Sequence, residues 1–211
     1  MVKSLWNMSE GRHRYFIINK PYGMLSQFVG EQEDCMLGKL NFNFPEGIHA
    51  IGRLDKYSEG LLILTTNKKV TKLLFGSKTS HKRVYLVKVK NEMKPETLQR
   101  LKEGVPITVE NGATYIAKPF DVEFAQSPAN LVEVLENPIP FYLPHTWLQI
   151  TLAEGKYHQV RKMVKAISHR CVRLIRVSIE DLLLGDLEPG GVQEIEEETF
   201  FTKLKIENWR K

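Results

Sequence analysis

Short apolar stretches separated by polar turns make up most of this chain. Segments 15–18, 61–65, 82–90, 147–153 and 171–177 are rich in β-branched and aromatic residues, which predicts strands. Segment 82–90 alternates, so that one face of its strand would carry Arg83, Tyr85, Val87 and Val89. Shorter strands are predicted at 105–109, 114–117, 121–124 and 131–135. The chain is therefore rich in strands.

The clearest helical pattern begins near His158. Apolar residues recur there at helical spacing, at Val160, Met163, Val164 and Ile167. At about 100° per residue, the opposite side of this helix carries His158, Arg161, Lys162 and Lys165. A second helix is predicted at 95–103, with proline in its first turn and glycine at its end, and a short basic helix around 70–74.

The order of these elements predicts the fold class. Strands outnumber helices and do not alternate regularly with them, which favours an α+β domain with a largely antiparallel sheet. We expect a loop and a short helix in 27–44, a surface loop in the proline-containing segment 137–144, and a turn or short element in 181–187. The sequence has no internal repeat or obvious linker.

Charge is segregated along the chain, whose net charge is +5. Residues 151–177 hold seven Lys or Arg and one acid, and residues 78–90 hold five cations and no acid, whereas 179–200 hold eight acids and no Lys or Arg. Such segregation fits a basic face that binds a polyanion. It fits equally well a fold in which the basic and acidic segments neutralise each other.

Several classes of protein are disfavoured by composition. The longest apolar runs are far shorter than the roughly 20 residues that cross a bilayer, and residues 1–14 lack the apolar core of a signal peptide. The two cysteines, Cys35 and Cys171, have no CxxC spacing, and the six histidines are scattered. We expect a cytoplasmic protein without a metal, an organic cofactor or a membrane partner.

Four segments stand out together, and they occur in a fixed order. They are NKPYG at 19–23, GRLDKYSEGLL at 52–62, KRVY at 82–85 and EGKYHQVRKM at 154–163. In this order they resemble the pseudouridine synthases of the ribosomal small-subunit synthase A family, over about 16–195. The resemblance implies an RNA pseudouridine synthase with an antiparallel mixed sheet in two lobes, flanking helices and a central active-site cleft.

The resemblance also implies catalytic residues. Conversion of uridine to its C-glycoside needs neither redox chemistry nor group transfer, and a carboxylate serves as nucleophile or base. By itself Asp55 would be a turn residue, but the resemblance makes it the catalytic carboxylate. It implies that Arg161 pairs with Asp55 and that Tyr85 stacks on the target base. An arginine close to Asp55 would lower the pKa of the carboxylate and keep it ionised.

Other residues are expected to bind the RNA. By resemblance, Arg53 fills the space that the flipped nucleotide leaves, and Leu174 lines the uracil pocket. Lys20 and Lys156 are expected near the cleft, as phosphate contacts or as supports for other residues. Lys162 and Lys165 are expected to contact phosphates from the helix face.

Residues 15–211 are expected to form the catalytic domain after a short extension, 1–14, with no S4 RNA-binding domain before it. This favours a subgroup of large-subunit synthases that lacks the S4 domain, and therefore a uridine in 23S ribosomal RNA as the substrate of a monomeric enzyme. A tRNA-modifying synthase and a non-catalytic RNA-binding or ribosome-assembly protein are the alternatives. The chain departs from the family pattern at Ser168 and Glu180, where glycine is usual, and at Gln193, where arginine is usual.

Overall fold

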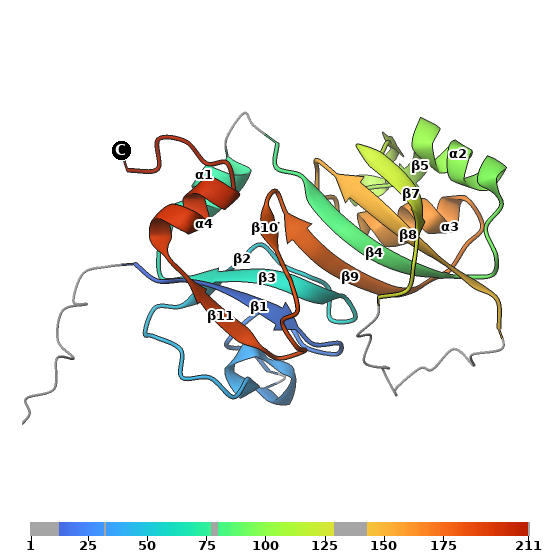
Figure 1. The fold of residues 1–211 in the computed structure, drawn as a ribbon. Coiled ribbons are helices and arrows are strands. Elements are labelled where there is room, and N and C mark those ends of the chain that lie inside the picture. The colour runs from blue at the N-terminus through green and yellow to red at the C-terminus, as the bar shows by residue number, and fades with distance from the viewer. Residues whose placement is uncertain (1–12, 32, 77–79, 129–142, 211) are drawn as a thin grey trace, which may run out of the picture.

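One mixed sheet runs through both halves of the molecule (Figure 1). The computed structural model describes residues 13–31, 33–76, 80–128 and 143–210. Its strands are β1 (Tyr15–Lys20), β2 (His49–Ile51), β3 (Glu59–Thr65), β4 (Arg83–Lys90), β5 (Val105–Thr108), β6 (Thr114–Ala117), β7 (Asp121–Ala125), β8 (His145–Leu152), β9 (Cys171–Ile179), β10 (Leu182–Leu183) and β11 (Val192–Ile195). Its α-helices are α1 (Lys69–Phe75), α2 (Pro95–Glu103), α3 (Gln159–Ala166) and α4 (Glu197–Lys203), and short 3-10 turns lie at Glu33–Cys35, Leu37–Lys39 and Glu110–Gly112.

The two halves of the sheet meet at β3 and β9. The strand order is β11-β1-β3-β9-β4-β8-β7, with β2 on β3 and β10 on β9, while β5 and β6 form a separate hairpin. Among the described strand pairs only β3 and β9 run parallel, and they pair only at Glu59 with Ile175 and Gly60 with Arg176. Gly60 has a φ of +96°, and a Cβ there would lie 2.3 Å from the Arg176 carbonyl oxygen. This close approach requires glycine.

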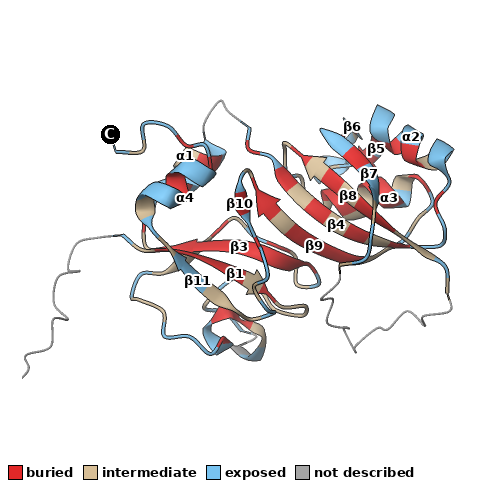
Figure 2. Cartoon of the chain, in the orientation of Figure 1, coloured by how far each residue is buried: buried red, intermediate tan, exposed pale blue. Residues whose placement is uncertain are grey.

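On one side of this seam, strands β1 and β3 are buried on both faces. In β1, Phe16 and Ile18 pack into one apolar cluster, while Tyr15 and Ile17 pack into another, together with Phe200 of α4. Strand β3 is buried along its whole length, as the red ribbon in Figure 2 shows. Because both faces are covered, these strands are continuous apolar runs in the sequence, without polar alternation.

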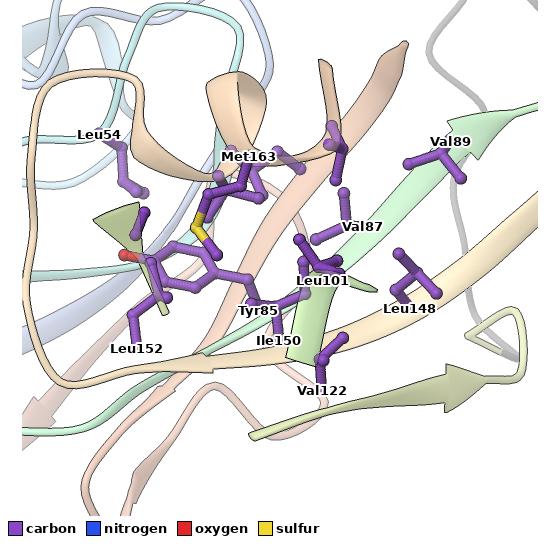
Figure 3. Packing of buried hydrophobic residues seen from close by; sticks show 14 of the residues in the cluster. Leu54, Tyr85, Val87, Val89, Leu101, Val122, Leu148, Ile150, Leu152 and Met163 are labelled. Atoms are coloured by element: carbon purple, nitrogen blue, oxygen red, sulfur yellow. The ribbon is translucent and has the colours of Figure 1, made fainter. Parts of the chain in front are cut away.

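On the other side of the seam, β4 and β8 are covered by α2 and α3. Figure 3 shows the buried side chains there, among them Val87 of β4, Leu101 of α2, Leu148 of β8 and Met163 of α3. Each such side chain contributes roughly 1.5–3 kcal/mol when it leaves water. The arrangement leaves the loops at the seam on a rigid frame.

Most predicted elements are observed, and the α+β fold class with its two-lobed antiparallel mixed sheet is confirmed. The helix predicted at 95–103 and the alternation in 82–90 are confirmed. The predicted strand 131–135 and most of the predicted loop 137–144 lie outside the described residues. The sequence pattern missed β2, β11 and α4, which are all short. Strand β11 and helix α4 draw their stability from partners far along the chain.

Two positions that depart from the family pattern have left-handed backbones. Ser168 has a φ of +64° and Glu180 a φ of +48°, so both occupy a conformation that favours glycine. Gln193, the third departure, is exposed on β11 at the edge of the sheet. None of the described helices has the length and apolar content needed to span a membrane.

Candidate active site

A cleft of about 880 Å³ lies at the seam of the sheet. Its floor is formed by side chains of β4 and β9, and its walls by the loop before β3, the loop before α3 and the end of α1. The lining includes five Lys or Arg and two acids, Asp55 and Glu154. The excess of cations suits a polyanionic ligand.

Asp55 lies in the wall of this cleft, in the loop between β2 and β3. Its Oδ1 atom lies 3.3 Å from His158 Nε2, and its Oδ2 atom lies 3.9 Å from Arg161 Nε. A third of its side chain is exposed. The carboxylate therefore faces the cleft while two cationic or hydrogen-bonding groups hold it from the side of α3.

Several side chains hold the loop that carries Asp55. The Ser26 hydroxyl accepts a hydrogen bond from Leu54 N at 2.9 Å and donates one to Leu54 O at 2.8 Å. Ser58 N donates to Asp55 O at 2.9 Å, which closes the turn. The backbone on both sides of Asp55 is thus fixed before any substrate arrives, which limits the ordering entropy of catalysis.

Lys20 lies beneath this loop and is completely buried. Its ammonium group donates to the carbonyl oxygens of Pro21, Met24 and Lys56, at 3.0, 2.6 and 3.2 Å. Burial lowers the pKa of Lys20 to about 8, against opposing attractions from Glu59 and Asp55. Of the two roles predicted for Lys20, its burial excludes direct phosphate contact and leaves support of the Asp55 loop.

Arg161 joins α3 to the Asp55 loop. Its Nη2 atom donates to Tyr57 O at 2.7 Å and to Ser58 Oγ at 3.3 Å. These contacts are shorter than its approach to Asp55, so Arg161 positions the loop as well as placing charge beside the carboxylate. The structure brings together the three segments that carry Asp55, Tyr85 and Arg161, because Tyr85 lines the same cleft.

The start of α3 contributes two residues to which sequence reasoning gave no role. His158 precedes the helix with a φ of +54° and reaches Asp55. Gln159 is buried, accepts from Lys156 N at 2.9 Å and donates to Glu154 Oε1 at 2.7 Å, which fixes the loop before the helix. Both lie inside the EGKYHQVRKM segment, and their place in that motif was the available signal.

The floor of the cleft is apolar near Tyr85. Tyr85 and Leu174 are 8% and 5% exposed and both line the cleft. In Figure 3 the Tyr85 ring lies among Leu54, Leu152 and Met163. A flat aromatic ring with apolar neighbours is a suitable surface for a nucleobase.

Four of the basic residues predicted to bind RNA are at least partly exposed. Arg53 and Lys165 are exposed, and Arg53 lines the cleft. Lys156 also lines the cleft, with its Nζ atom 3.7 Å from Glu154 Oε2. The Lys162 ammonium donates to Thr108 O at 2.7 Å. These four residues remain candidates for RNA contact.

Two of the seven cations in residues 151–177, Arg173 and Arg176, do not lie on an exposed basic face. Both are buried. Arg173 donates from Nε and Nη2 to the two carboxylate oxygens of Glu59, each at 2.7 Å. The side chains of β9 alternate between an inner and a cleft-facing side. Arg173 lies on the inner side, where Glu59 neutralises its charge.

Among the described residues, no group of three or more His, Cys, Asp or Glu side chains is arranged to hold a metal ion.

Comparison with known proteins assigns the chain to a family. The family model for RNA pseudouridylate synthases matches residues 14–166, a span that contains Asp55, Tyr85 and Arg161. The chain therefore belongs to the RNA pseudouridine synthases and is an isomerase.

The relatives narrow this class. The chain is 35% identical over 186 residues to ribosomal large subunit pseudouridine synthase E of Vibrio parahaemolyticus, with 87% of this chain and 74% of the relative covered. It is 34% identical over 175 residues to the protein of the same name from Xanthomonas axonopodis, covering 82% and 89%. A crystal structure of a pseudouridylate synthase superposes with a TM-score of 0.69 at 25% identity, covering 92% of this chain and 74% of that one. The predicted resemblance to the large-subunit subgroup, that of synthase E, is confirmed.

Proposed function

We propose that this protein converts one uridine of 23S ribosomal RNA to pseudouridine, with Asp55 as the catalytic carboxylate. The position of Asp55 carries the proposal: it is a cleft carboxylate held between His158 and Arg161. Support for the substrate comes from the relatives named as ribosomal large subunit synthases. We extend the proposal to a monomeric cytoplasmic enzyme that acts without a cofactor.

The reaction rearranges bonds within one nucleotide. The N1–C1′ bond breaks, the uracil ring turns, C5 bonds to C1′, the proton on C5 leaves, and N1 gains a proton. Atoms and electrons balance without an oxidant or a second substrate. The carboxylate of Asp55 serves as the nucleophile or base that this sequence needs, since it faces the cleft in which the nucleotide would lie.

The surroundings of Asp55 suit this task. A base that enters the cleft displaces water, which strengthens the attraction between Asp55 and Arg161. Extraction of the base from the RNA costs a few kcal/mol. Stacking on Tyr85 and contact with Leu174 offset this cost by roughly 1–3 kcal/mol, and Arg53, exposed at the cleft, fills the vacated place in the RNA.

The experiment uses ribosomal RNA from cells that lack this gene, with pseudouridines mapped by carbodiimide primer extension. We expect one 23S site to be lost, and to be restored by the wild type but not by Asp55→Ala or Asp55→Asn. Asp186→Asn, a change at an exposed acid, is the matched control and should restore the site.

Three outcomes contradict parts of the proposal. A site lost from tRNA, with ribosomal RNA unchanged, would make the protein a tRNA-modifying synthase. Restoration by Asp55→Ala would remove Asp55 from the chemistry. An unchanged map combined with a defect in subunit assembly would indicate a non-catalytic assembly protein.

A further inference from the structure

Two arginines with no assigned role lie on the cleft floor in neighbouring strands. Arg83 begins β4 and Arg176 lies in β9, and both are buried while lining the cleft. Arg176 is the register partner of Tyr85, and the β4–β9 pairing shifts between Val84 and Tyr85. A bulge of this kind redirects side chains and is common beside active sites. It brings both arginines to the same floor as Tyr85.

The hydrogen bonding of these arginines is incomplete. Arg176 donates from Nε to Leu61 O at 2.8 Å, but its buried Nη2 atom has no hydrogen-bond partner. Arg83 lies over the Phe75 ring, 5.4 Å from its centroid, and forms no ion pair with the residues that the structure describes. By contrast Arg173, also in β9, bonds both oxygens of Glu59.

The acids around these arginines are already occupied. Glu59 is held by Arg173, and Asp55 lies between His158 and Arg161. Glu154 accepts from Tyr115 Oη at 2.8 Å and from Gln159. Glu180 accepts from Lys82 N at 2.6 Å and pairs with Lys205. Among the described residues, none of these acids forms an ion pair with Arg83 or Arg176.

Such an arrangement is costly unless a ligand completes it. An arginine stays charged in proteins, so a buried guanidinium with a free N–H cannot avoid the penalty by losing its proton. Burial lowers the pKa of Arg83, and repulsion from Arg176 acts in the same direction, against attraction from Tyr85 and Glu180. An anion that reaches both groups would relieve the repulsion and satisfy the free donor. Phosphate suits this role, because its oxygens match the fork of an arginine.

We propose that Arg83 and Arg176 form an anion subsite on the cleft floor that binds a phosphate group of the target nucleotide. The inference deepens the proposed function and rests on it. The phosphate would be anchored at the two arginines while the base lies on Tyr85 and Leu174. This anchoring fixes the nucleotide at two points, so that its sugar is presented to Asp55 in one orientation.

Uridine and uridine 5′-monophosphate serve as probes, because they differ only in the phosphate. Their dissociation constants are measured by calorimetry for the wild type, Arg83→Gln, Arg83→Lys and Arg100→Gln. Arg100 is exposed on α2 and outside the cleft lining, so its variant is the matched control. Circular dichroism and thermal unfolding establish that each variant is folded.

We expect the wild type and Arg100→Gln to bind the monophosphate about tenfold more tightly than uridine, since charge-assisted bonds to phosphate are strong. Arg83→Gln should bind both ligands alike, with its affinity for uridine unchanged. Arg83→Lys should keep part of the difference, because lysine retains the charge without the fork. If Arg83→Gln does not fold, the reduced difference in Arg83→Lys carries the test.

The subsite is overturned if the wild type binds the two ligands with equal affinity or binds neither. It is also overturned if Arg83→Gln keeps the full difference in affinity between the monophosphate and uridine. These readouts need neither turnover nor a known RNA target. Failure of the proposed function is seen separately, as an unchanged pseudouridine map in the deletion strain.

Discussion

His158 Nε2 lies 3.3 Å from the Oδ1 atom of Asp55, closer than Arg161, whose Nε atom lies 3.9 Å from Oδ2. The two groups approach opposite oxygens of one carboxylate, His158 from just before α3 and Arg161 from within it. His158 has a left-handed backbone, with a φ of +54°, and its ring contacts Oδ1 while Arg161 approaches Oδ2. These two contacts fix the rotation of the carboxylate about its Cβ–Cγ bond as well as its position.

We expect His158→Asn to lower kcat/KM about tenfold, because one orienting contact to Asp55 is lost and such contacts are worth about 1–2 kcal/mol. Asparagine tolerates the left-handed backbone, so thermal stability should not change. The measurement is single-turnover pseudouridine formation on transcribed RNA. His49→Asn, outside the cleft lining, is the control. Unchanged activity would show that the His158 side chain does not orient Asp55 for the reaction.

Gly60 tests the seam of the sheet. Gly60→Ala should lower the free energy of unfolding by about 3 kcal/mol or more, because the new Cβ would meet the Arg176 carbonyl oxygen at 2.3 Å and its φ is +96°. Gly185→Ala has a φ of +60° but open space around it, and should cost only about 1–2 kcal/mol. Urea unfolding measures both. Equal losses would mean that β3 and β9 separate without cost.

The ion pair between Glu59 and Arg173 joins the same two strands in a buried place. We expect Glu59→Gln or Arg173→Met to cost about 3–5 kcal/mol of stability, since each leaves a buried charge alone. The double variant should cost less than the sum of the two. Glu194→Gln, which breaks the half-exposed pair with Arg14, should cost no more than about 1 kcal/mol. Additive losses in the double variant would contradict the pairing energy.

The lowered pKa of Lys20 predicts that the free energy of unfolding rises with pH. Its pKa is about 8 in the folded chain and 10.5 when unperturbed, so between these values the unfolded chain binds more protons. The free energy of unfolding should therefore increase through this window, by up to about 3 kcal/mol. Below pH 8 Lys20 is protonated in both states and contributes no slope.

The measurement compares the wild type with Lys20→Met by urea unfolding at several pH values from 7 to 10.5. Other lysines and tyrosines titrate in both proteins, so the difference isolates Lys20. If the difference in unfolding free energy between the two proteins stays constant across this range, burial does not lower the pKa of Lys20.

Lys165 is exposed on α3, whereas the neighbouring Lys162 ammonium already bonds Thr108 O. We expect Lys165→Glu to weaken RNA binding and to reduce the slope of log K against log salt by about 1, because one phosphate contact is removed. Lys203→Glu on α4 should change neither. An unaltered slope for Lys165→Glu would show that this face of α3 is solvated surface that does not contact the RNA.

The sequence predicted more of the frame than of the site. The alternation in 82–90 and the apolar stripe of α3 identified β4 and α3, because each residue there repeats the environment of its neighbours two or four positions away. Strand β11 and helix α4 were missed, because the partners that stabilise them lie on β1, about 180 residues earlier. The local sequence pattern carries no information about such distant partners.

The same division applies to the charged residues. The ordered motifs identified Asp55 and Arg161, since each motif is local and its residues are read directly. The burial of Lys20, Arg173 and Arg176 was decided by tertiary structure alone. The partners of Arg173 and Arg176 on β3 lie 114 and 115 residues away, and a charge that looks exposed in sequence can be buried and paired in space. The sequence by itself determined the reaction class and the strands that build the frame, because motifs and periodicity are local. Which cations face the RNA, and which support the loop of Asp55, depends on desolvation by distant segments.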